Sequence, residues 1–173
     1  MDPKEAARRV AEIDARDNES RGERLAELNG LLPDDLIGFS GQAAEWLFDD
    51  VKATWIYGYF TATVLAARAL CLQQLAGLIR MQPDDPSLPD SIGSLDQLSA
   101  LAEERRVIDL DLRARLLTLD DVGRMYASVD LHEYDAQVER RAQEAERFAE
   151  EHSLLTDARA ALECSVALLH RRA

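Results

Sequence analysis

The stretch ATWIYGYFTATVLAARALCLQQLAGLI, residues Ala53 to Ile79, decides the fold, because Arg68 is its only charged side chain in a chain that is 31% charged. Steps of three and four residues place on one face of an α-helix Ile56, Phe60, Val64, Ala67, Cys71, Leu75 and Leu78. A second apolar stripe beside the first consists of Tyr57, Leu65, Leu72 and Ile79. So wide an apolar arc is typical of a helix contacted from several sides. We therefore predict that Ala53 to Ile79 forms the central helix of a bundle.

The same stretch is long enough to span a bilayer, for which about 20 apolar residues suffice. Arg68 lies near its middle, where a charged residue costs roughly 2.5–3.5 kcal/mol on insertion scales, and Gln73 and Gln74 follow it. We therefore predict no membrane span. We expect Arg68 either to pair with a carboxylate of a neighbouring helix or to mark the face where the core meets solvent or a second subunit.

The length and composition of the chain predict one all-α domain, residues 1–173. A chain of 173 residues can bury a core without a metal or a disulfide. Ala, Leu, Glu and Arg dominate, which favours helices. Cys71 and Cys164 lie in apolar stretches, as reduced core thiols do. The charged start MDPKEAARRV lacks the apolar region of a secretory signal, so we expect a cytoplasmic protein.

The charge balance limits the partners that the chain can bind. With 20 basic and 33 acidic residues the formal net charge is −13, which repels a phosphate backbone over most of the surface. We therefore expect no general coating of nucleic acid, although a local basic patch could still bind RNA. One hypothesis is an acidic adaptor whose charged segments, Glu5 to Glu27 and Glu133 to Glu151, dock a basic protein partner.

Residues 1–32 are predicted to form a charged N-terminal helix beside the bundle. Asp2 is placed to cap it and Pro3 to occupy its first helical position. Its apolar stripe is thin between Asp14 and Glu23, so this helix is expected to fray in the middle, break near Gly22 or find its cover on a partner subunit. The central helix carries more apolar surface than one bundle side needs, and the N-terminal helix carries less than a stable helix needs. We therefore expect a homodimer, in which a second copy covers both.

The remaining helices are predicted from their caps and stop signals. Ser40 is placed to cap a short helix that leads directly or through a kink into the central helix, which stops at Met81 before three prolines. Ser94 and Asp109 are placed to cap the next two helices, and a last helix is expected from about Leu154 to Arg171. The prediction is an antiparallel helical bundle with its core in residues 53–171.

Motifs for metal, phosphate or nucleophilic chemistry are missing from the sequence. The three histidines, His132, His152 and His170, share no metal-ligand spacing, and none closes a Glu-x-x-His pair. There is no Gly-x-Ser-x-Gly motif, no phosphate-binding glycine loop and no Cys-x-x-Cys motif. We therefore predict no cofactor and no metal. The sequence His132-Glu133-Tyr134-Asp135 is interpreted as a solvated helix entry.

One run of segments resembles a known family. A helix containing Tyr57-Gly58-Tyr59-Phe60-Thr61-Ala62 continues into an Ala-rich half and leads through a loop to Ser94-Leu95-Asp96-Gln97-Leu98. A leucine-rich helix follows, and then Gly123-Arg124-Met125-Tyr126-Ala127-Ser128-Val129-Asp130-Leu131-His132. This order, over roughly Ala53 to His170, resembles the HEPN superfamily of small helical-bundle proteins.

The resemblance implies two functions. Catalytic HEPN proteins are metal-independent ribonucleases that use an Arg and a His four to six residues apart, pooled across a homodimer. His can move the proton of the RNA 2′-hydroxyl, and Arg can stabilise the phosphate. Arg124 and His132 would be that pair, but seven residues separate them, and Met125 stands where the family usually has a polar residue. These departures favour a homodimeric binding or accessory protein without its own chemistry, in the bacterial toxin–antitoxin or defence setting that the resemblance implies. RNA is a partner only of the ribonuclease.

Overall fold

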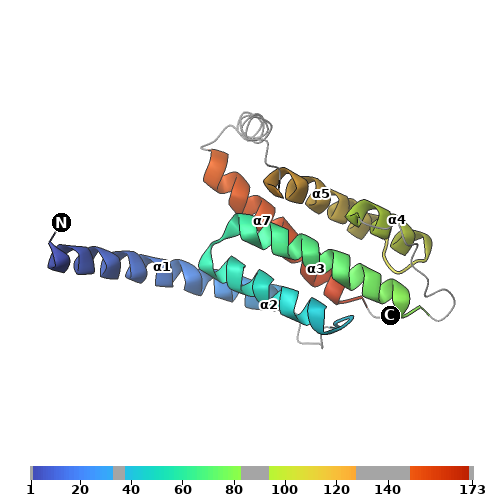
Figure 1. Ribbon diagram of the computed structural model, residues 1–173, viewed down its shortest axis with the longest axis horizontal. Coiled ribbons are helices and arrows are strands. Elements are labelled where there is room, and N and C mark those ends of the chain that lie inside the picture. The colour runs from blue at the N-terminus through green and yellow to red at the C-terminus, as the bar shows by residue number, and fades with distance from the viewer. Residues whose placement is uncertain (1, 33–37, 83–93, 128–148, 172–173) are drawn as a thin grey trace.

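The computed structural model describes residues 2–32, 38–82, 94–127 and 149–171, and all regular structure in these ranges is helical. The prediction of an all-α protein is therefore confirmed. Figure 1 labels the helices of these ranges, which are α1 (Pro3–Leu31), α2 (Gln42–Tyr57), α3 (Phe60–Arg80), α4 (Leu95–Glu104), α5 (Leu110–Ala127) and α7 (Ala149–Leu169). The last helix ends two residues before the predicted Arg171, within the usual uncertainty of helix ends, but it begins at Ala149, so the predicted start near Leu154 is wrong.

The central stretch is two helices, where we predicted one. α2 ends at Tyr57, and Gly58 adopts a left-handed conformation with φ of 76°. The amide of Tyr59 then donates to the carbonyl of Thr54 at 2.9 Å, which satisfies a carbonyl at the helix end. Because only glycine takes this conformation without strain, Gly58 ends α2 and lets α3 run back antiparallel to it (Figure 1).

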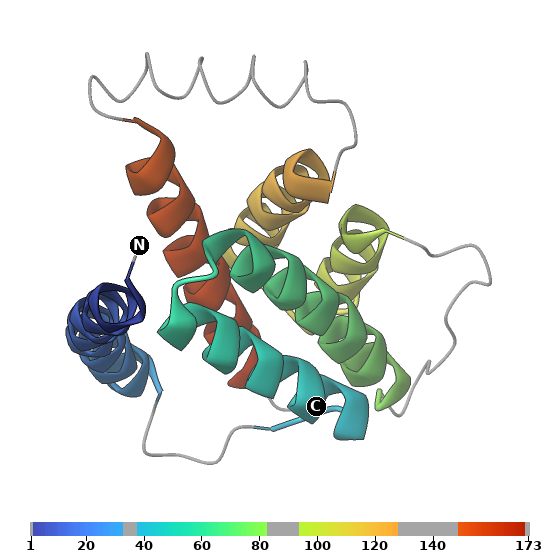
Figure 2. The ribbon, with the colours of Figure 1, turned by 60° about the vertical axis from the view of Figure 1, so that its left-hand side comes forward.

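Helix α3 lies at the centre of the bundle, as the apolar arc predicts. It packs against α2 and α7 and also against α4 and α5, so other helices surround it (Figure 2). Within the described ranges it is the one helix long and apolar enough to cross a bilayer, and 56% of its most apolar window is buried inside the protein. The buried side chains at its middle include Val64, Ala67, Leu70, Cys71 and Leu75.

Helix α1 is one continuous helix, so the alternative of a break near Gly22 is wrong. A Cβ atom at Gly22 would meet nothing within 4 Å, and the backbone passes through this residue in regular helical form. Asp2 caps the helix by accepting from the amide of Lys4 at 3.3 Å, as predicted. Only the C-terminal half of α1 lies along the bundle, while the N-terminal half projects beyond it (Figure 1).

Ser94 and Asp109 are the caps that the sequence indicates, but Ser40 is not one. Ser94 accepts from the amide of Gln97 at 3.2 Å and Asp109 from that of Leu112 at 2.9 Å. α2 instead begins at Gln42 after Gly41, without a side-chain cap. The prediction for Ser40 is wrong because this residue packs against α3, where its hydroxyl donates to the carbonyl of Gln73 at 3.3 Å.

Candidate functional site

Arg124, one of the two predicted catalytic residues, lies in the last turn of α5. Its side chain is 63% exposed, and Nη2 lies 2.5 Å from Oδ1 of Asp121 and 3.5 Å from Oδ2 of Asp120. Two carboxylates therefore offset its charge. The other predicted residue, His132, and the sequence His132-Glu133-Tyr134-Asp135 lie outside the described residues, so the pairing of Arg124 with His132 stays a prediction.

Asp120, which Arg124 contacts, is also the ion-pair partner of Arg68. Nε of Arg68 donates to Oδ1 of Asp120 at 2.7 Å, which joins α3 to α5, and the Asp120 side chain is 1% exposed. This confirms the prediction that Arg68 pairs with a carboxylate of a neighbouring helix. Asp120 lies between two guanidinium groups. One of its carboxylate oxygens pairs with the half-buried Arg68, and the other lies near the exposed Arg124. The cluster is close to neutral, which gives it little attraction for a phosphate.

The close approach of α3 and α5 at this point depends on Gly123. A Cβ atom added there would lie 2.4 Å from Cδ of Arg68. The stem of Arg68 thus crosses α5 where a side chain is missing. A glycine in a helix is unfavourable by itself, so its place here has a packing reason.

Cys71 and Cys164 are buried and form no disulfide, as predicted for core thiols. Sγ of Cys71 lies 3.8 Å from Oγ of Ser165, across the contact between α3 and α7. The hydrogen bond with Cys164 and burial raise the pKa of the Cys71 thiol well above its ordinary value. A protonated, buried thiol is a poor nucleophile. Cys71 is therefore part of the core rather than a reactive group.

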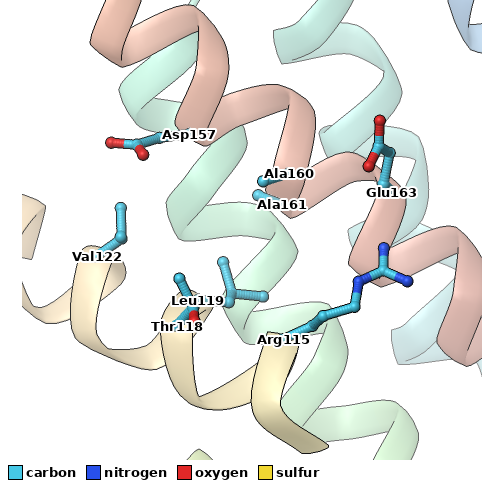
Figure 3. A pocket seen from close by; sticks show the side chains of 8 residues that line it. All are labelled: Arg115, Thr118, Leu119, Val122, Asp157, Ala160, Ala161 and Glu163. Carbon is cyan, nitrogen blue, oxygen red and sulfur yellow. The ribbon is translucent and has the colours of Figure 1, made fainter. Parts of the chain in front are cut away.

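A cavity of about 140 Å³ lies between α5 and α7 (Figure 3). Its lining combines apolar and charged side chains, which are Arg115, Thr118, Leu119, Val122, Asp157, Ala160, Ala161 and Glu163. Sequence reasoning missed this cavity because its residues belong to two helices that are far apart in the chain and carry no motif. The spacing of Arg115, Leu119 and Val122 on one helical face is the only signal that the sequence holds.

A second feature that the sequence does not indicate is an aromatic and arginine surface at the base of the projecting half of α1. The rings of Tyr57 and Tyr59 stack with 6.2 Å between their centroids, and both are exposed. The guanidinium carbon of Arg21 lies 4.9 Å from the centre of the Tyr57 ring. The turn at Gly58 creates this surface, because it brings the two tyrosines out of the core together. We call Tyr57, Tyr59 and Arg21 the tyrosine surface.

The same region anchors α1 to the bundle. Nε1 of the buried Trp55 donates to the carbonyl of Arg24 at 3.0 Å, and Nε of Arg24 donates to the carbonyl of Ile56 at 2.9 Å. Arg159 of α7 forms an ion pair with Glu27 of α1. The C-terminal half of α1 is thus held by specific polar contacts to two helices.

The described residues contain no group of three His, Cys, Asp or Glu side chains that could hold a metal ion. Comparisons of the chain with protein-family models, with curated proteins and with solved structures found no match.

Proposed function

We propose that this chain is a HEPN-like helical-bundle binding module that works as a cytoplasmic homodimer and performs no reaction of its own. The all-α fold supports this proposal, and so does the order of a central helix, a Ser-capped helix and a leucine-rich helix. The observation that carries it is the N-terminal half of α1, which projects from the bundle and exposes 56% of Val10.

The projecting half of α1 needs cover to be stable. Arg21 contacts the ring of Tyr57 on α2, whereas the Arg8–Glu12 and Arg21–Asp17 ion pairs stay within α1. An isolated helix shorter than about 12–15 residues is marginal in water. Ala6 and Val10 lie one helical turn apart and give this half an apolar strip. A partner that buries this strip would stabilise the helix.

Charge favours a second copy of the chain as that partner. Residues 3–31 contain six basic and seven acidic side chains, a net charge of −1, so −12 of the total −13 lies elsewhere. Two acidic copies repel each other least where their charges balance. With basic and acidic residues mixed along α1, two copies can also form ion pairs with each other.

The arrangement that we propose is an antiparallel pair of α1 helices. In it, the strip formed by Ala6 and Val10 of each copy packs on the tyrosine surface of the other. Stacked, exposed tyrosines with a neighbouring arginine are typical of protein interfaces. The interface is isologous, so the same surface of each copy is used twice.

Size-exclusion chromatography with light scattering tests the dimer. At micromolar concentration we expect twice the chain mass of 19.3 kDa. Val10→Glu should shift the protein to the monomer, because it would bury a charge in the interface. Ala15→Glu is the matched control, since Ala15 is exposed and its position lies on the opposite side of α1 from Val10. A monomeric wild type, or a Val10→Glu variant that remains dimeric, would refute this arrangement.

The absence of catalysis is tested separately. The ion pairs of Arg124 with Asp120 and Asp121 support a structural role for this residue. We therefore expect no cleavage of single-stranded RNA by the purified protein and no growth inhibition on expression. Cleavage that disappears in both Arg124→Ala and His132→Ala would establish the ribonuclease instead.

A further inference from the structure

The cavity between α5 and α7 has an apolar interior of a definite size. Leu119, Val122 and Ala161 are buried and line it together with Ala160. A cavity of about 150 Å³ with apolar walls holds a molecule the size of benzene. Sites for drug-sized ligands are larger, about 300–1,000 Å³. The cavity of about 140 Å³ therefore fits a branched aliphatic group of a few carbon atoms.

One end of this cavity carries charges of both signs. Arg115 on α5 extends toward α7, and Glu163 on α7 lies at the same end of the cavity with its carboxylate turned away from α5 (Figure 3). In the described structure neither side chain forms a hydrogen bond or an ion pair, although both are half-buried. Arg159 attracts the Glu163 carboxylate without a direct ion pair, so both Arg115 and Glu163 keep hydrogen-bonding capacity for a ligand with complementary charges.

The two ends of the cavity differ. At the other end, Asp157 accepts a hydrogen bond from the hydroxyl of Tyr126 at 2.7 Å. Arg115 and Glu163 also line a second hollow, beside His170 and Arg171. The cavity opens to solvent at the exposed Thr118 and Ala160, and a ligand would place its polar group at the charged end and its apolar group against Leu119, Val122 and Ala161.

We propose that this cavity binds a free apolar α-amino acid with a branched side chain, such as L-leucine. Its carboxylate would pair with the guanidinium of Arg115 and its ammonium with the carboxylate of Glu163. Its side chain would contact Leu119, Val122 and the two alanines. No bond is formed or broken. The residues that line this cavity belong to α5 and α7, and none lies in the projecting half of α1, so the proposal does not rest on the dimer.

Isothermal titration calorimetry with L-leucine tests the proposal. We expect one molecule per chain with a dissociation constant of about 1 mM or tighter, a modest affinity for a ligand of this size. L-leucinamide lacks the carboxylate and 4-methylpentanoate lacks the ammonium, so each should bind at least tenfold more weakly. Glycine should not bind, because it leaves the apolar interior empty. No heat with L-leucine would overturn the proposal.

Variants locate the site. Arg115→Gln and Glu163→Gln should each weaken binding at least tenfold and leave the thermal midpoint nearly unchanged, because neither side chain has a described ion-pair partner. Ala160→Leu should fill the cavity and abolish binding. Ala53→Leu, at an exposed position of α2, is its matched control and should bind like the wild type. Unchanged binding in Arg115→Gln and in Glu163→Gln would overturn the site.

The comparison of ligands also separates a free amino acid from a peptide. L-leucinamide resembles the amino terminus of a peptide, and N-acetyl-L-leucine resembles its carboxyl terminus. Binding of either one as tight as that of L-leucine would show that one charge suffices. That result would overturn the free amino acid in favour of a chain terminus.

Discussion

Nε of Arg68 lies 2.7 Å from Oδ1 of Asp120, and this contact is the one described ion pair between the central helix α3 and α5. Asp120→Ala would leave Arg68, 25% exposed, without its partner. Loss of one partner of a buried pair costs about 3–5 kcal/mol, and the partial exposure of Arg68 reduces this. We expect a loss of about 2–3 kcal/mol in the free energy of unfolding, measured by urea denaturation.

The double variant Arg68→Met with Asp120→Leu checks the cause of that loss. Replacing both charges by apolar side chains of similar size is often neutral or stabilising. We therefore expect the double variant to recover most of the stability that Asp120→Ala loses. If it were as unstable as Asp120→Ala, the packing of these positions and not the unpaired charge would be responsible.

Gly123 and Gly22 should respond oppositely to the same substitution. Both lie inside helices, where Ala is better than Gly by about 0.5–1 kcal/mol. A Cβ atom at Gly22 meets nothing, so Gly22→Ala should stabilise by about that amount. At Gly123 it would displace Arg68, so Gly123→Ala should destabilise by about 1 kcal/mol or more. Urea denaturation measures both.

A second substitution separates the two causes at Gly123. In an Arg68→Ala background the obstacle is gone, and Gly123→Ala should then become stabilising. Continued destabilisation in that background would mean that another neighbour of Gly123 opposes the Cβ atom.

The sequence predicts the helical class and most helix ends for a local reason, because caps such as Ser94 and Asp109 act on neighbouring amides. It does not predict the break at Gly58, since apolar residues continue on both sides of this glycine and only its conformation divides the helices. An isolated glycine in an apolar run is compatible with either outcome.

The sequence does not predict which residue pairs with Arg68, nor the cavity between α5 and α7, because both depend on how the helices pack. The charge of Arg68 in an apolar stretch predicts some carboxylate, but 33 acidic residues are available, and only packing selects Asp120. Arg115 and Glu163 belong to segments 48 residues apart and share no motif. Their common site exists only because α5 and α7 pack together.

Gln74 should matter for stability although it is an uncharged residue of the core. Its Oε1 accepts from the amide of Ser40 at 2.9 Å, and its Nε2 donates to the carbonyl of Gly38 at 2.8 Å. Gln74→Leu would remove both hydrogen bonds and should cost about 2 kcal/mol, as measured by thermal or urea unfolding. Gln73→Leu is the matched control and should change stability by less than about 0.5 kcal/mol. Equal effects of the two would contradict this role.

Asp109 should make stability depend on acid pH. Its hydrogen bond from the amide of Leu112, followed by its contact with Arg171, lowers the pKa of its carboxyl group below the ordinary value near 3.8. A lowered pKa in the folded state means that the stabilisation is fully present above the ordinary value and is lost as the pH falls through the folded value. Asp109→Asn keeps a side chain that can cap α5 but does not titrate. The stability difference between wild type and Asp109→Asn should therefore be constant near pH 7 and shrink below about pH 4. Urea denaturation across this range measures it, and a difference that grows on acidification would contradict the assignment.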